Sequence, residues 1–338
     1  VDEYQGVLRA AIASAGNDLR LGADEAPPAI TSVYLGDQIG AMVDCIVKGE
    51  NYVAPKSYES SIGVPESPIF PKDATDRNRT SPFAYTGDKF ELRSVGSSMN
   101  AAEANICLNT IVADAFGKFA DELECKSDLE KSANAIISRE LKKHSRIIYN
   151  LDGYGPEWVK EAERRKLLNN KNTADAVEVL FEENSISVFE RHKVYTREEA
   201  VARANIKLEN YTKTINIEAL TMIEMARREI IPSVSEFICS LCAGVNAKKS
   251  AGASSAVEGK LIEKLNALNE SAFNAVEKLE TDLQAIEFKD VRSAAQAMAH
   301  TIIPDMETLR KAVDEMERYT ASQFWTMPTY FDLLYSVN

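Results

Sequence analysis

The sequence predicts an α-rich α+β protein, in which loops and a short antiparallel sheet in residues 1–100 precede a bundle of helices. Seven of the eleven prolines lie within the first 82 residues, and because proline interrupts helices, this part should hold loops, short strands and one or two helices. From Asn100 onward, apolar residues recur at helical spacing, as in Ile106, Ile111 and Phe119. We therefore expect two domains, residues 1–100 and residues 101–338.

The helical part is divided by glycine, proline and short polar stretches, which are typical helix boundaries. Thr196 precedes two glutamates, as an N-cap residue often does, and Pro156 suits the first position of a helix. We expect helices over about 101–124, 127–149, 156–166, 196–245 with a break near Pro232, 254–285, 291–302 and 305–319.

Composition and charge exclude several classes of protein. The chain of 338 residues carries 52 Asp and Glu against 39 Lys and Arg, a net charge of −13. Because nucleic-acid binding depends on a basic surface, this balance argues against a nucleic-acid partner. No uninterrupted apolar run approaches the ~20 residues of a membrane-spanning helix, so no membrane partner is expected.

The five cysteines lack the spacing of a disulfide framework, which predicts a reducing, cytoplasmic environment. Cys239 and Cys242 form a Cys-x-x-Cys pair, a spacing that can hold zinc or take part in redox chemistry. Zinc requires two further ligands, and no second such pair exists. The surrounding helical periodicity favours two half-buried cysteines of a helix.

Charged side chains are concentrated in two segments of the first part. Arg20 and Glu25 lie in a loop punctuated by glycine and proline, and Arg79 precedes a segment in which Lys89, Glu91 and Arg93 alternate. On a strand, alternation at period two places all three side chains on one face. Two interpretations stay open: a solvated face with mutual ion pairs, or groups that converge on an acidic ligand.

Two of these motifs resemble a known family. The run Leu-Arg-Leu-Gly-Ala-Asp-Glu-Ala-Pro-Pro-Ala (19–29) and the run from Asn78 to Ser98, with Asn-Arg-Thr-Ser and Lys-Phe-Glu-Leu-Arg, resemble the C-terminal half of glutamine synthetases of the type III class. Residues 213–222 are similar to the helical C-terminal region of that class. The resemblance implies that residues 1–100 hold the flap loop and the substrate and metal strand of the catalytic domain, and residues 101–338 the helical C-terminal region.

The resemblance also implies a role for each matching residue. Glu25 would be the flap glutamate that takes a proton from ammonium, and Arg79 the arginine that approaches the transferred phosphate of the nucleotide. Arg20 and Arg93 would hold the substrate glutamate. Lys89 would be a cation on the nucleotide side, and Glu91 a ligand of one divalent metal ion.

The implied function is glutamate–ammonia ligation in glutamine biosynthesis, with ATP and Mg²⁺ or Mn²⁺ as cofactors and γ-glutamyl phosphate as intermediate. Phosphoryl transfer depends mainly on positioning and charge neutralisation, which suits arginines and a metal ligand. The implied partners are glutamate, ammonia, ATP and further copies of the chain in a ring-shaped homo-oligomer, a dodecamer in this family.

The chain also departs from the family. Leu19 and Asp24 stand where the class usually has His and Asn, and the family's β-grasp domain and paired metal-binding glutamates precede the flap motif and are not matched in this sequence. We therefore expect the chain to be a C-terminal fragment that is inactive alone. Two alternatives stay open: a non-catalytic helical assembly or interaction module derived from glutamine synthetase, and a related γ-glutamyl-amine ligase.

Overall fold

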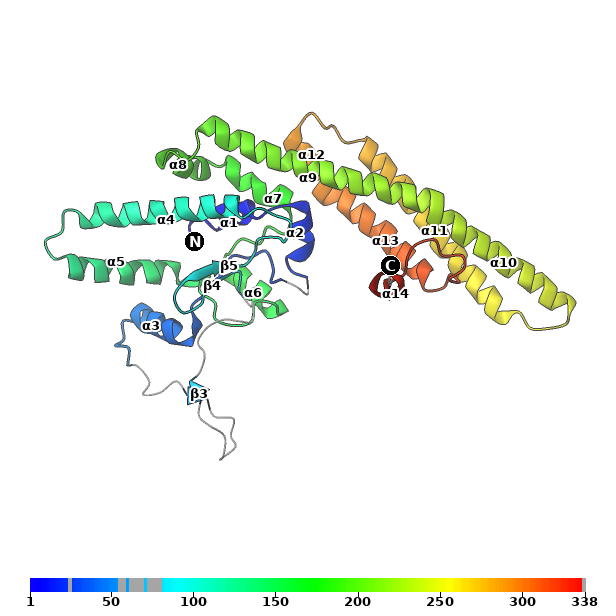
Figure 1. Ribbon diagram of the computed structural model, residues 1–338, viewed down its shortest axis with the longest axis horizontal. Coiled ribbons are helices and arrows are strands. Elements are labelled where there is room, and N and C mark those ends of the chain that lie inside the picture. Colours follow the sequence, from blue (N-terminus) through cyan, green and yellow to red (C-terminus); the bar gives the residue numbers. More distant parts are fainter. Residues whose placement is uncertain (24–25, 54–58, 61–69, 72–80, 336–338) are drawn as a thin grey trace. The chain divides into compact units, whose positions relative to one another are not determined.

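The computed structural model describes residues 1–23, 26–53, 59–60, 70–71 and 81–335, and the chain separates into two compact units, Val1–Lys207 and Leu208–Asn338. Helices make up most of the described residues, and a small sheet lies in the first unit (Figure 1). This confirms the α-rich α+β class. The boundary expected near residue 100, which separates strand-bearing from helical sequence, stays a prediction.

The first unit holds the strands and the shorter helices. Its helices are α1 (Gln5–Ala11), α2 (Ala15–Arg20), α3 (Gly36–Lys48), α4 (Ala102–Leu123), α5 (Leu129–His144), α6 (Pro156–Arg164), α7 (Thr173–Glu178), α8 (Glu183–Arg191) and the start of α9 (Arg197–Met225), with 3₁₀ turns η1 (Ser145–Ile147) and η2 (Val179–Phe181). Its strands are β1 (Val33–Tyr34), β2 (Glu59–Ser60), β3 (Phe70–Pro71), β4 (Phe83–Tyr85) and β5 (Phe90–Leu92).

The three-stranded sheet has the order β1-β4-β5 and mixed strand directions. β4 and β5 are antiparallel, with Ala84 opposite Glu91, whereas β1 runs parallel to β4, with Val33 opposite Phe83. The expectation of a purely antiparallel sheet is therefore wrong for β1. A parallel neighbour requires a long crossover, and here the chain between β1 and β4 includes α3.

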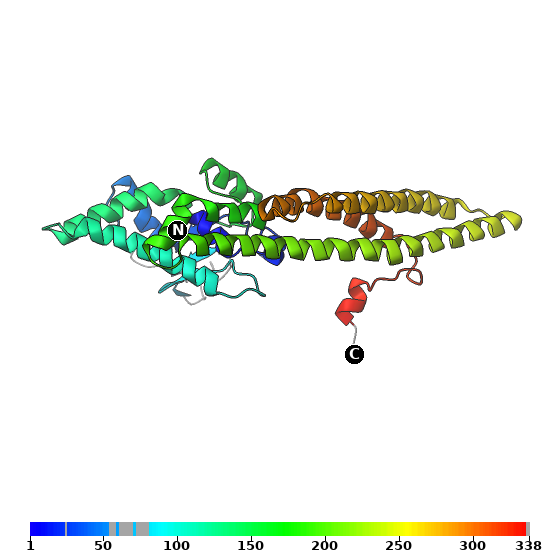
Figure 2. The same cartoon turned by 90° about the horizontal axis from the view of Figure 1, so that it is seen from above.

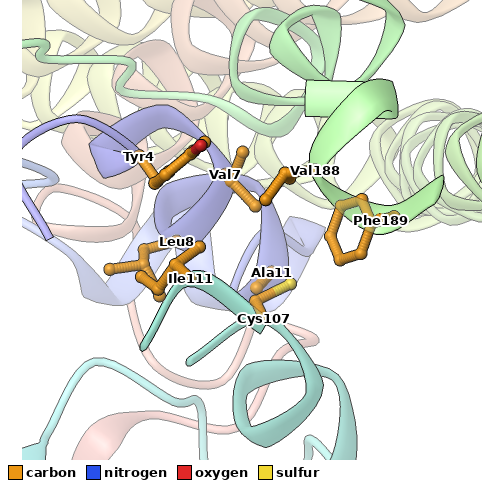
Figure 3. Close-up of a cluster of buried hydrophobic side chains, with 8 residues drawn as sticks. All are labelled: Tyr4, Val7, Leu8, Ala11, Cys107, Ile111, Val188 and Phe189. Carbon is orange, nitrogen blue, oxygen red and sulfur yellow. The ribbon is translucent and has the colours of Figure 1, made fainter. Parts of the chain in front are cut away.

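A compact apolar cluster packs α1 against α4 and α8. Figure 3 shows Val7, Leu8 and Ala11 of α1 facing Ile111 and the Cys107 thiol of α4, with Val188 and Phe189 of α8 and Tyr4 beside them. All eight side chains are buried. Because three segments far apart in sequence meet here, this cluster fixes the N-terminal segment within the unit.

Asp114 of α4 adds a polar anchor beside that cluster. Its side chain is only 2% exposed, yet it accepts hydrogen bonds from the Tyr4 hydroxyl (2.7 Å), from His192 Nε2 (3.1 Å) and from Arg191, and it pairs with Lys118 Nζ (2.9 Å). Burial alone would raise the pKa of Asp114, but the hydrogen bonds from Lys118, Tyr4 and His192 outweigh it and hold the pKa well below its ordinary value. Asp114 is therefore ionised and fully paired.

The second unit is a bundle of long helices. After the rest of α9 come a π turn η3 (Ala226–Ile230), α10 (Ile231–Ser250), α11 (Ala256–Gln284), α12 (Val291–Ala297), a second π turn η4 (Met298–Ile302), α13 (Ile303–Glu317) and α14 (Tyr330–Tyr335). α11 packs along both α10 and α13 (Figure 2). The core of the second unit includes the fully buried side chains of Leu265, Leu279, Met298, Leu309 and Met316.

The predicted break near Pro232 is absent, because α9 continues into α10 through the π turn at Ala226–Ile230. A second π turn, Met298–Ile302, lies two residues before Pro304 and joins the two helices that we expected to be separate. Proline lacks an amide hydrogen, and its ring clashes with the preceding turn of an α-helix. A widened π turn just before each Ile-Ile-Pro sequence lets the helix continue past its proline.

The helix over Arg197–Ser250 is the one described segment long and apolar enough to cross a membrane, by length and composition only. Its apolar stretch packs Val234, Phe237 and Ile238 into the second unit. The expectation that the chain has no membrane partner stays a prediction.

The cysteines of the Cys-x-x-Cys pair lie on α10, as expected, but Cys239 and Cys242 are both exposed instead of half-buried. Among the described residues, no group of three or more potential metal ligands occurs. Cys125 is also exposed, whereas Cys107 is buried, and burial raises its pKa to about 12.

Replacing Asp114 by Ala should lower the free energy of unfolding by about 3 kcal/mol, because it leaves Lys118, Arg191 and Tyr4 without their shared acceptor. Urea unfolding of the variant would measure this. The matched control is Glu122→Gln: Glu122 lies on α4, as Asp114 does, and its exposed pair with Arg139 of α5 should contribute at most about 1 kcal/mol.

The Asp114 carboxylate should also make the stability of the protein depend on pH. Because folding lowers the pKa of Asp114, its contribution is present above the ordinary carboxyl value of about 4 and is lost as the pH falls below it. The difference in free energy of unfolding between wild type and Asp114→Ala should therefore be larger at about pH 6 than at about pH 2. A difference that stays constant over this range would contradict the assignment.

Thiol labelling should separate the cysteines. Iodoacetamide should modify Cys125, Cys239 and Cys242 rapidly in the native protein, and Cys107 only after unfolding in guanidinium, because a buried thiol with a raised pKa forms little thiolate. Mass spectrometry after timed labelling measures the order. Native labelling of Cys107 at the rate of Cys125 would contradict it.

Candidate functional site

Arg20 lies at the end of α2 and is tied to the segment that follows β5. Its Nη1 donates to Asn17 Oδ1 (3.2 Å) and to the Ser94 carbonyl (3.4 Å), and its Nη2 donates to the Arg93 carbonyl (3.4 Å). The helix itself begins at a Ser14 N-cap, whose hydroxyl accepts from the Asn17 amide. A short capped helix thus delivers the Arg20 guanidinium to the end of the strand.

The charged residues of the second motif form a row at β5. Arg93 Nη2 lies 3.1 Å from Glu91 Oε2, and Lys89 Nζ lies 3.8 Å from Glu91 Oε1. The row therefore shows the mutual ion pairing that the alternation left open as one interpretation. The two cations differ in setting, because the Arg93 side chain is 16% exposed and the Lys89 side chain 63% exposed.

Arg20 and Arg93 also line one small cavity, together with Ser94, Tyr154 and an apolar wall that includes Pro27 and Pro82. Its volume is about 20 Å³, enough for roughly one water-sized group. Two of its lining residues are arginines, whose guanidinium groups can bind carboxylates through two parallel hydrogen bonds. The second interpretation of the sequence motif, convergence on an acidic ligand, is therefore compatible with the ion-paired row.

Two of the six predicted site residues, Glu25 and Arg79, lie outside the described residues, as does Asp24. Leu19 lies on the exposed side of α2. The structure thus brings Arg20, Arg93 and Glu91 close together and places Lys89 at the outer edge of the row.

Glu91 was predicted to bind a divalent metal. Its carboxylate lies between two cations, and the described part of the chain contains no group of three or more potential metal ligands. Mg²⁺ and Mn²⁺ require several oxygen ligands. The described residues alone therefore do not make a divalent-metal site, and the role of Glu91 as a ligand stays a prediction.

Comparison with known proteins finds similarity to glutamine synthetases along the whole chain. Residues 132–249 match the family described as glutamine synthetase C-terminal domain. The chain is 35% identical over 343 residues to a glutamine synthetase of Butyrivibrio fibrisolvens, a match that covers 100% of this chain and 49% of that protein. The chain is similar to glutamine synthetases over its whole length. The predicted resemblance is thus confirmed.

One of the similar proteins is named as a type-3 glutamine synthetase. This chain is 34% identical over 346 residues to that protein, from Dictyostelium discoideum, and 31% identical over 350 residues to a glutamine synthetase of Bacteroides fragilis. These matches cover 99% of the chain and 47% and 48% of the relatives. The chain therefore spans about half the length of the curated relatives it matches.

Asn17 is a site residue that the sequence did not reveal. Its side chain is 2% exposed, and its Nδ2 donates to the Ile12 carbonyl (2.7 Å) and to the Ser94 carbonyl (2.9 Å), while its Oδ1 accepts from Arg20. A Cβ at Gly96 would lie 3.3 Å from this Oδ1, so the glycine allows the close approach. Asn17 thus joins α2 to the end of β5 and orients Arg20.

Replacing Asn17 by Ala should lower the free energy of unfolding by about 1–3 kcal/mol, because the buried carbonyls of Ile12 and Ser94 lose a donor. Asn109→Ala, on the exposed face of α4, is the matched control and should change stability by no more than about 0.5 kcal/mol. Urea unfolding of both variants measures the difference. Equal stabilities of the two variants would show that Asn17 does not join these segments.

Proposed function

We propose that the protein containing this chain is a glutamine synthetase, an ATP-dependent ligase that forms glutamine, ADP and phosphate from glutamate, ammonia and ATP through γ-glutamyl phosphate. The similarity to named glutamine synthetases along the whole chain supports this. The observation that carries it is that Arg20 donates to the Arg93 carbonyl and that both arginines line one small cavity, because arginine is well suited to bind the carboxylates of an acid substrate.

The two arginines are held before any ligand arrives. Arg20 is held by Asn17 and by the carbonyls of Arg93 and Ser94, and Arg93 is held by Glu91. Arginine side chains lose much rotamer entropy when a ligand immobilises them. Because these two are already oriented, binding a carboxylate of glutamate between them costs less of that entropy.

The remaining roles follow the family resemblance. Arg79 neutralises charge on the transferred phosphoryl group, and Glu25 accepts a proton from ammonium, so that ammonia attacks the acyl phosphate. Lys89, exposed at the outer edge of the row, contacts the nucleotide. The proposed setting is a cytoplasmic ring-shaped homo-oligomer, a dodecamer, with ATP and Mg²⁺ or Mn²⁺ as cofactors.

The test is an assay of glutamine formation by the full-length protein and its Arg93→Lys variant. Lysine keeps the positive charge but loses the planar fork, so the KM for glutamate should rise at least about ten-fold while the KM for ATP changes little. Arg164→Lys is the matched control, because Arg164 is exposed and pairs within α6 with Glu161.

Assays with ammonium and with putrescine in parallel distinguish a glutamine synthetase from a γ-glutamyl-amine ligase. Turnover with putrescine and none with ammonium would show that the protein is a γ-glutamyl-amine ligase and not a glutamine synthetase. If Arg93→Lys left the KM for glutamate unchanged, Arg93 and the cavity that it lines would not bind glutamate.

A further inference from the structure

The helix that carries Arg20 is held on two sides. Asn17 and Arg20, three residues apart on α2, contact the segment that follows β5, whereas Asp18 contacts α1 and the start of α7. We propose that Asp18 is a positioning residue, which orients Arg20 for glutamate by fixing α2 to residues 170–173. This inference rests on the proposed function, in which Arg20 binds glutamate.

Both carboxylate oxygens of Asp18 have a donor from another element. Oδ1 accepts from Nη2 of Arg9 on α1 (2.9 Å), and Oδ2 accepts from the backbone amide of Thr173, the first residue of α7 (2.5 Å). The side chain of Asp18 is 11% exposed and that of Arg9 is 3% exposed. Asp18 therefore holds α2 against two other helices through contacts that are largely shielded from water.

Arg9 connects the same carboxylate to the segment that precedes α7. Its Nε donates to the Asn170 carbonyl (2.8 Å), and its Nη2 also donates to the Lys171 carbonyl (3.2 Å). Residues 170–173 lie within the range 132–249 that matches the glutamine synthetase C-terminal domain family, whereas α2 lies outside it. The region that matches this family thus supports α2 directly.

The geometry of a short helix explains how these contacts affect Arg20. Successive residues of an α-helix are turned by about 100°, so Asp18 and Arg20 lie about 200° apart, on opposite sides of α2. Without the contacts of Asp18, α2 would be held on one side only. Hydrogen bonds weaken steeply when donor and acceptor are misaligned, so a turned or shifted Arg20 would bind a carboxylate less tightly.

Stability alone does not explain the pair of Arg9 and Asp18. Burial raises the pKa of Asp18 above its ordinary value, although the charge of Arg9 and the hydrogen bonds from Arg9 and Thr173 act in the opposite direction. Because folding disfavours the ionised carboxylate, its charge does not add to the free energy of folding. A buried ion pair that does not stabilise can still select one geometry, here the placement of α2.

The test compares wild type, Asp18→Ala and the double variant Arg9→Met/Asp18→Leu in the full-length protein, by isothermal titration with glutamate and by glutamine formation. Asp18→Ala leaves a buried guanidinium unpaired and should lower the thermal midpoint, whereas the double variant leaves no such charge and should keep the midpoint near that of wild type. Both variants should raise the Kd and the KM for glutamate about ten-fold. The kcat and the KM for ATP should stay unchanged, because only binding of glutamate is weakened.

Leu279→Ala is the matched control for loss of stability. Leu279 is fully buried in the second unit, so its truncation should lower the thermal midpoint by leaving a cavity. Its Kd and KM for glutamate should equal those of wild type. If Leu279→Ala weakened glutamate binding as much as Asp18→Ala does, the effect would be one of stability, and the role of Asp18 would be overturned.

Binding and turnover distinguish the positioning role from the proposed function. If wild type forms glutamine and the double variant leaves both Kd and KM for glutamate unchanged, the role of Asp18 is overturned and the function stands. If wild type binds glutamate without forming glutamine and the double variant weakens that binding, the proposed function fails and the role of Asp18 stands. If wild type does not bind glutamate, both are overturned.

Discussion

The buried carboxylate of Asp114 is the interaction on which the first unit depends. A carboxylate that is 2% exposed is costly to desolvate, and this one is stabilised by groups from three separate segments: Tyr4 at the N-terminus, Lys118 one turn further along α4, and Arg191 with His192 at the end of α8. Apolar packing of α1 on α4 and α8 has no direction of its own. The hydrogen bonds to Asp114 select one arrangement of these helices.

The position of Arg20 follows from that arrangement. α1 carries Arg9, whose side chain is buried and pairs with Asp18 of α2 at 2.9 Å, and Asp18 in turn accepts from the Thr173 amide at the start of α7. Asn17 then joins α2 to the Ser94 carbonyl. A series of polar contacts, buried or partly buried, therefore links α1 to the Arg20 guanidinium.

The second unit is stabilised differently. Its described core is mostly apolar, with α11 packed against α10 and α13, and ion pairs such as Arg227 with Glu277 lie on its exposed surface. Helical periodicity was sufficient to predict the long helices of this unit to within a few residues, whereas α14 (Tyr330–Tyr335) was not predicted. It could not predict their continuity across Pro232 and Pro304, because a π turn is selected by the packing of the whole helix and not by the local sequence.

The sequence by itself determined the class of the fold, most of the long helices, the charged row at β5 and the resemblance that marks Arg20 and Arg93, since all of these depend on residues within one helix, strand or loop. Tertiary structure alone decided the parallel pairing of β1, the partners of Asp114, and the contacts of Asn17 with Ser94 and of Asp18 with Thr173. Asp18 and Thr173 are 155 residues apart in sequence. A buried polar group is defined by what packs around it, and no local spacing records contacts across such a separation.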